Sequence, residues 1–169
     1  EEALNAYREA PSADTLKAAR AAVSRLREYE KHYSRLENIL FAYLERTGFS
    51  APSKVMWGVH DEIRDGWKAL TALLEKAEGA GGETLATGAL ALFEPLATTI
   101  RDMIYKEEHI LFPAALERLN DADWAAIREQ GEEIGYCYAR PGRAWVPGLG
   151  KEEGAAAAEP TRAHGGAEV

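Results

Sequence analysis

The chain has a single cysteine, Cys137, among its 169 residues. One thiol cannot form an intrachain disulfide or a cysteine-based zinc site, and it is typical of a reducing compartment, so we expect a cytoplasmic protein. No apolar run is long enough to cross a bilayer, which argues against a membrane protein. Basic residues are outnumbered by acidic ones. The formal net charge of −8 disfavours nucleic acid and anionic membranes as partners.

Several common motifs are also absent. The sequence contains no His-Glu-x-x-His, no Gly-Lys-Ser/Thr phosphate loop and no Cys-x-x-Cys, and it lacks the Glu-x-x-His of ferritin-like di-iron proteins. No stretch alternates apolar and polar residues for long enough to predict a β-strand. The composition, with 46% hydrophobic and 28% charged residues, is that of an ordinary soluble domain. These absences favour an all-α protein without a recognisable catalytic motif.

Apolar residues recur at spacings of three and four along most of the chain, which predicts long amphipathic helices. Ser12 is placed to cap a helix that runs from Ala13 to about Arg46, where Gly48 ends it. The start, Glu1, has no helix cap and no initiator methionine before it, so the chain reads as though it begins inside a helix. Further helices are expected over residues 3–9, 51–79, 83–116 and 122–134.

Two prolines, Pro95 and Pro113, lie within the helical segment 83–116. Each removes a backbone donor, so we expect a kink or an interruption at both positions. The last helix should be capped by Asn120 and closed by Gly135. After this helix proline and glycine become frequent. We therefore predict one helical domain over residues 1–140 and an extended, largely disordered tail over residues 141–169.

One motif occurs twice, at residues 32–41 (HYSRLENILF) and at residues 103–112 (MIYKEEHILF). Each copy places polar, metal-capable groups directly before Ile-Leu-Phe, and a strongly apolar triplet of this kind faces a core. Two copies suggest two helices that line one shared site. The matched positions are Glu37 with Glu108, Asn38 with His109, and His32 with Met103.

The three histidines of the helical part, His32, His60 and His109, fall on three different long helices. His60 lies among apolar residues, so we expect its ring to point inwards. A buried imidazole needs a partner for each nitrogen. A metal ion with a second acceptor behind the ring is one solution, and a plain hydrogen bond to a carboxylate is the commoner one.

His32 and Glu37 are five residues apart, which corresponds to about 140° of rotation and about 7.5 Å of rise on a helix. Because helical side chains lean towards the N-terminus, a cation between helices could bind both; the alternative for Glu37 is a solvated surface charge. The alignment of the two copies favours Glu108 as the carboxylate that points inwards, and Glu107 is the alternative. The candidate metal ligands are His32, Glu37, His60, Glu108, Glu107 and His109. Such a nitrogen and oxygen donor set suits iron or manganese and also accepts zinc.

Four segments together carry a family resemblance: residues 32–41, 55–64, 106–113 and 133–137. In this order they resemble the haemerythrin-like (HHE) cation-binding domains, and most of all the prokaryotic branch of unknown function that is often fused to PAS sensor domains. The resemblance implies an up-down four-helix bundle with a non-haem iron site, usually di-iron. Here the first helix is truncated and a short extra helix follows the bundle. Met103 and Arg64 depart from the family pattern, because each stands where a further ligand would be expected.

The resemblance favours a protein that binds iron and senses or carries O2 or NO, or responds to redox state. A binding or sensing role is favoured over an enzyme. Two alternatives stay open. One is a metal-free helical module for interaction or dimerisation, for which Trp124, Tyr136, Tyr138 and Trp145 could supply the contact surface. The other is an iron-dependent oxidoreductase or peroxidase. A homodimer or a fused signalling domain is the expected protein partner.

Overall fold

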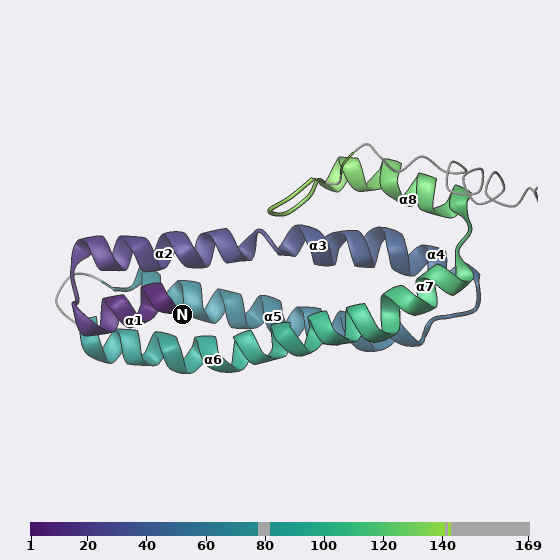
Figure 1. Ribbon diagram of the computed structural model, residues 1–169. Helices are drawn as coiled ribbons and strands as arrows, with labels where there is room; N and C mark the ends of the chain where they lie inside the picture. The colour runs from purple at the N-terminus through teal and green to yellow at the C-terminus, as the bar shows by residue number, and fades with distance from the viewer. Residues whose placement is uncertain (78–81, 141, 143–169) are drawn as a thin grey trace, which may run out of the picture.

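The computed structural model describes residues 1–77, 82–140 and 142, and all regular secondary structure within these residues is helical (Figure 1). The all-α prediction is therefore confirmed for the described part of the chain. The predicted tail, residues 141–169, falls almost wholly outside the described residues. In chain order the elements are α1 (Glu2–Glu9), α2 (Ala13–Arg27), α3 (Glu30–Arg35), the π-helical turn η1 (Leu36–Leu40), α4 (Phe41–Arg46), α5 (Ala51–Glu75), α6 (Gly82–Lys106), the π-helical turn η2 (Glu107–Leu111), α7 (Phe112–Arg118) and α8 (Asp121–Ile134).

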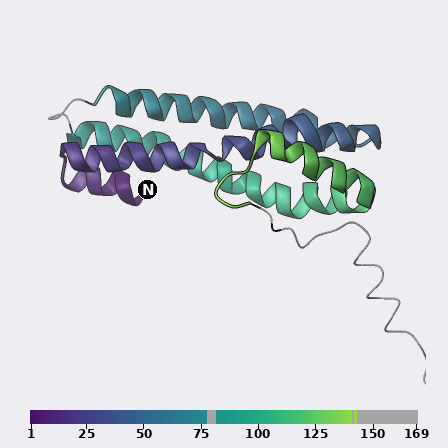
Figure 2. The same ribbon diagram turned by 90° about the horizontal axis from the view of Figure 1, so that it is seen from above.

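Three long rods lie side by side, as Figures 1 and 2 show: the run from α2 to α4, then α5, then the run from α6 to α7. The short helix α1 packs against α2 and α6 at one end of these rods. At the other end α8 lies over α3 and η1. The expected helical bundle with a short first helix and an extra last helix is thus observed, and α8 covers the part of the bundle that α1 does not reach.

The predicted helix caps are present. The Ser12 side chain accepts a hydrogen bond from the backbone N–H of Thr15 at 3.2 Å. The Asn120 side chain accepts from the N–H groups of the first turn of α8 at 2.9 and 3.0 Å. Gly135, with φ of 84°, ends that helix in a backbone conformation that favours glycine. Short side-chain acceptors at these positions satisfy donors that a helix start leaves free.

The long helix expected from Ala13 to Arg46 is interrupted. Between α2 and α3 the N–H groups of Glu28 and Tyr29 bond to carbonyls only three residues back, at 3.2 and 3.1 Å, which tightens the chain. Further along, η1 loosens the helix by one extra residue per turn. No proline or glycine marks either site, so the pattern of apolar residues alone does not predict the interruptions.

The two prolines differ in how the helix accommodates them. Pro95 does not interrupt α6, which runs from Gly82 to Lys106 without a break. Because Pro95 lies on the exposed face, water can satisfy the carbonyl that loses its helical partner. Pro113 lies in the first turn of α7, immediately after η2, where a missing N–H costs little.

The apolar core extends along the whole bundle and encloses a few polar side chains. Within residues 1–77 and 82–140 the buried polar residues are Glu37, Ser53, His60 and Glu107, and three of these four come from the candidate metal ligands. Among the described residues, no helix combines the length and apolar character that a bilayer crossing requires. The fold therefore gathers carboxylate and imidazole groups inside the bundle.

Candidate metal centre

Both copies of the repeated motif contain a π-helical turn, η1 in the first and η2 in the second. A π turn inserts one extra residue and rotates the side chains that follow it, and such turns are frequent at functional sites. In the first copy Glu37 lies inside η1 and is 8% exposed. In the second, Glu107 is the first residue of η2 and is 2% exposed. The two turns therefore place one carboxylate from each copy inside the bundle.

The first hydrogen-bonded pair joins His32 of α3 to Glu107 of η2. The distance from His32 Nε2 to Glu107 Oε2 is 2.8 Å, and the two residues are 75 positions apart in the sequence. The His32 side chain is 19% exposed and the Glu107 side chain 2%. The pair therefore links two rods of the bundle, with the imidazole towards the surface and the carboxylate towards the core.

The second pair joins His60 of α5 to Glu37 of η1, with 2.7 Å between His60 Nδ1 and Glu37 Oε1. His60 is fully buried, as its apolar neighbours predicted. Burial lowers the pKa of His60 below its ordinary value, while the hydrogen bond to Glu37 and the charges of both buried carboxylates oppose that shift. The His60 ring is therefore neutral. Its Nδ1 carries the proton and donates a hydrogen bond to Glu37.

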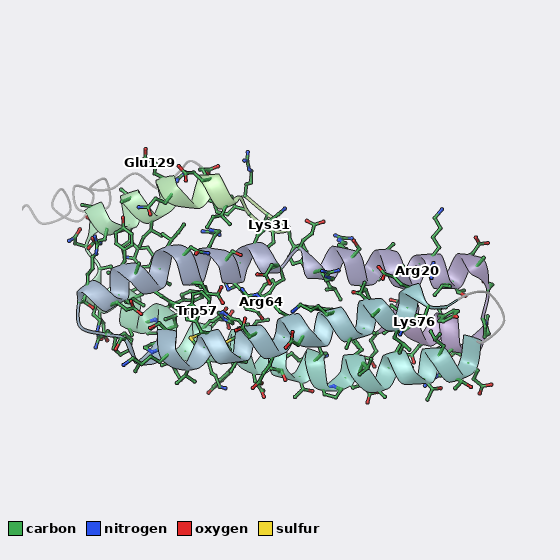
Figure 3. The ribbon with its side chains drawn as sticks, turned by 180° about the vertical axis from the view of Figure 1, so that it is seen from behind. Arg20, Lys31, Trp57, Arg64, Lys76 and Glu129 are labelled. Atoms are coloured by element: carbon green, nitrogen blue, oxygen red, sulfur yellow. The ribbon has the colours of Figure 1, made fainter. Side chains whose placement is uncertain are left out.

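Arg64, one turn after His60 on α5, takes up the rest of the Glu37 carboxylate. Its Nη1 and Nη2 donate to Glu37 Oε1 and Oε2 at 3.0 and 2.7 Å, a bidentate arrangement. The same guanidinium also donates to Glu30 at 2.8 Å and to Asp61 at 2.9 Å. Figure 3 shows Arg64 in the space between α5 and the rod that contains α3 and η1. These contacts, above all the hydrogen bond to Glu37, raise the pKa of Arg64.

The Tyr33 ring lies between the two histidine pairs. It stacks on the His60 ring with 4.1 Å between centroids, and it follows His32 directly in the chain. Burial raises the pKa of Tyr33, and the charge of Glu107 adds to the shift. The influence of Glu107 on the pKa of both Tyr33 and His60 places the two pairs in one electrostatic neighbourhood.

Three buried polar atoms in this neighbourhood have no hydrogen-bond partner among the described residues: His60 Nε2, Glu107 Oε1 and the Tyr33 hydroxyl. A buried polar atom without a partner costs about 1–3 kcal/mol, so native proteins rarely leave one unsatisfied. Two of these three atoms, the imidazole nitrogen and the carboxylate oxygen, are metal-ligand types. A bound cation, or a water molecule that donates a hydrogen bond, would interact with the lone pairs of these two atoms.

The alignment of the two motif copies predicted that Glu108 points into the bundle, and this prediction is wrong. Glu108 and His109 are both exposed, and Glu107 is the buried one. His109 Nδ1 donates to its own helix, at 2.9 Å from the Tyr105 carbonyl, and its ring stacks on that of Tyr105. Glu108 and His109 therefore lie outside the interior cluster.

The alignment failed because the two copies have different surroundings. The first copy is covered by the bundle on one side and by α8 on the other, so Glu37 and Ile39 are both buried. The second copy lies at the edge of the bundle and buries only a narrow stripe, so that Ile110, the counterpart of Ile39, is 56% exposed.

The residues present do not hold a metal ion in the observed arrangement, and the donor atoms they leave free suit one ion and not two. In the described part of the chain, no group of three or more His, Cys, Asp or Glu side chains is close enough together to hold an ion as folded. Both oxygens of Glu37 already accept from Arg64, which removes the bridging carboxylate that a second ion would need. The free atoms on His60 and Glu107, with His32 bonded to the latter, remain as donors for one ion.

The role of Arg64 was not predicted, although the sequence carries a signal for it. Its spacing of four residues from His60 places both side chains on one face of α5, so both meet the same partner across the bundle. What the sequence could not supply was the position of Glu37 opposite that face. An arginine one turn from an inward histidine is therefore a useful sign that a buried carboxylate lies nearby.

Comparison with protein-family models matches residues 1–115 to the Hemerythrin HHE cation binding domain. This range contains both hydrogen-bonded pairs and Arg64, whereas α8 lies beyond it. A search of the curated proteins found no match.

Proposed function

The chain belongs to the haemerythrin HHE cation-binding domain family, and on that premise we propose that it binds a single metal ion inside the bundle. The proposed ligands are His60, Glu107 and His32, whose side chains must move closer together than they lie in this structure to hold the ion. The observation that carries the proposal is the pair of buried, unpartnered donor atoms on His60 and Glu107. An ion would satisfy both and would also repay the cost of burying them.

The state of His60 supports its role as a ligand. Metal-bound histidines commonly donate their second ring N–H to a carboxylate, which fixes the tautomer and the ring orientation. His60 makes that contact to Glu37, so its Nε2 presents a lone pair to the interior. We accordingly assign Glu37, expected to be a direct ligand, to the positioning of His60. Arg64 would supply the positive charge that a second ion supplies in a di-iron centre.

Two imidazoles and a carboxylate suit iron first, with manganese and zinc as alternatives. Iron, when bound, supplies a one-electron redox couple and an affinity for O2 and NO, so the finer proposal is a sensor or carrier that responds to these gases or to redox state. The chain itself contributes a dry interior and a neutral His60. The chain also contributes His32, which is partly exposed and is hydrogen-bonded to the buried Glu107.

Metal analysis and an absorption spectrum of the purified protein test this proposal. We expect about one ion per chain and no absorption band of an oxo-bridged iron pair. The variants His60→Ala and Glu107→Ala should each lose most of the metal. The control is His109→Ala, which replaces an exposed histidine on the same rod as Glu107 and should keep the metal. Equal metal content in all three variants would refute the assignment.

A second function is favoured by the contacts of Arg64. Because its guanidinium neutralises Glu37 without any ion, the bundle can be stable in a metal-free state, as a module for interaction or dimerisation. Wild-type protein that stays folded and takes up no iron, manganese or zinc on reconstitution would support this second function over the first.

A further inference from the structure

A cavity of about 270 Å³ lies beneath α8, where this helix covers α3 and η1. Two α8 side chains, Trp124 and Ile127, form its outer wall. Because α8 lies outside the range matched to the family, these two wall residues do too, whereas the rest of the lining lies inside that range. Its lining residues are His32, Arg35, Leu36, Ile39, Leu40, Phe112, Trp124 and Ile127.

The one permanent charge in this lining belongs to Arg35. Its Nε is buried and has no hydrogen-bond partner among the described residues, and no carboxylate of those residues lies within 4.0 Å of its guanidinium. The guanidinium instead stacks on the Tyr136 ring, with 4.2 Å between Cζ and the ring centroid. The Arg35 side chain is partly buried, and its Nε is shielded from water without an acceptor, so this N–H is left to a group that the described residues do not supply.

The packing around Arg35 leaves space for its side chain. A Cβ added at Gly131 of α8 would lie 3.3 Å from Arg35 Nε, so a side chain there would crowd the guanidinium. The Tyr136 ring covers one face of the guanidinium as an aromatic platform. Arg35 is therefore held between α8 and the segment that follows it, at the edge of an otherwise apolar chamber.

We propose that this cavity binds a small organic monoanion, a carboxylate with a ring or a short aliphatic chain as its body. The carboxylate pairs with the Arg35 guanidinium, whose planar donors match it in a bidentate contact. The apolar body fills the space between Leu36, Leu40 and Ile127, which a strongly hydrated anion such as sulfate would not do favourably. The cavity volume lies just below the usual range for ligand pockets, so the ligand must be small.

Isothermal titration of the full chain with benzoate and with hexanoate tests the proposal, with benzyl alcohol as the neutral counterpart of benzoate. We expect at least one acid to bind saturably with one site per chain, and benzyl alcohol to bind at least about tenfold more weakly than benzoate, because it cannot form the charged hydrogen bonds. Arg35→Met should weaken the acid to a similar degree. No saturable binding of either acid, or equal binding of the alcohol, would overturn the proposal.

Arg46→Met is the matched control. Arg46 lies on the same rod and also stacks on a tyrosine, Tyr43, at 4.0 Å, but it is exposed and already paired with Asp123. Its loss should leave the affinity unchanged, and an equal loss in both variants would overturn the assignment to Arg35. Ile127→Phe provides a second test because it fills the cavity from α8 and keeps Arg35. It should abolish binding, and an unchanged affinity in this variant would also contradict the proposal.

This cavity shares one lining residue, His32, with the proposed metal centre, so a variant that alters only the metal centre is needed to separate the two sites. The His60→Gln variant, whose altered residue does not line the cavity, should keep its affinity for benzoate even if it has lost a metal ion. Loss of acid binding in this variant would show that the acid binds at a metal instead, and would overturn the present assignment.

Discussion

Replacement of Arg64 by methionine is expected to destabilise the bundle strongly. Methionine keeps much of the aliphatic volume but removes both donors to Glu37, whose side chain is only 4% exposed. The carboxylate would keep a single hydrogen bond, the one from the neutral His60 ring. The variant therefore buries a negative charge without its main partner.

The expected cost is about 3 kcal/mol of unfolding free energy, the lower end of the range for breaking a buried ion pair. The lower end applies because the Arg64 side chain is 22% exposed, so water can reach part of the vacated space. If Glu37→Gln is combined with Arg64→Met, no charge remains to be buried and much of the loss should be recovered.

Urea unfolding monitored by circular dichroism measures both variants. Lys68→Met is the control, since Lys68 pairs with Asp65 three residues away on the same helix and both side chains are more than 70% exposed. Its loss should cost less than about 0.5 kcal/mol. A loss for Arg64→Met no larger than for Lys68→Met would refute the inference that Arg64 compensates the buried carboxylate.

Three further predictions concern pH, packing and helix ends. Because the folded-state pKa of His60 lies below the unfolded value of 6.5, the metal-free protein should lose stability as pH falls below about 6.5, and His60→Gln should flatten this dependence in urea titrations. Gly82→Ala should cost about 1–3 kcal/mol because the new Cβ would overlap Pro11, whereas Gly58→Ala, with open space at the Cβ, should gain about 0.5–1 kcal/mol. Arg20→Met should lower the thermal midpoint, because Arg20 donates to three carbonyls at and beyond the end of α5; an unchanged midpoint would contradict this.

Local features of the fold were predictable because they depend on neighbouring residues in the sequence. Ser12 and Asn120 cap helices by bonds to the next turn, so their chemistry alone identifies them. The inward direction of His60 followed from its apolar neighbours. The break at Glu28 and Tyr29 has no such local signal and was missed.

The imidazoles and carboxylates that meet inside the bundle could be named from the sequence, whereas their pairing could not. The sequence named His32, Glu37, His60 and Glu107 as candidates, but which carboxylate meets which imidazole depends on how the rods pack. The sequence analysis favoured Glu108 over Glu107, and this was wrong. It assumed that the two similar motifs lie in the same surroundings in the fold. The contact between Arg64 and Glu37 joins residues 27 positions apart, so it too required the tertiary structure.

Anomalous diffraction from crystals grown with iron, manganese or zinc tests the central claim most directly. One peak per chain is predicted, at about 2.0–2.3 Å from His60 Nε2 and within bonding distance of Glu107, with the hydrogen bond from His60 Nδ1 to Glu37 retained. A peak bonded to Glu37 in place of Arg64 would contradict this account. So would a chain without a peak in which a water satisfies His60 Nε2 and Glu107 Oε1.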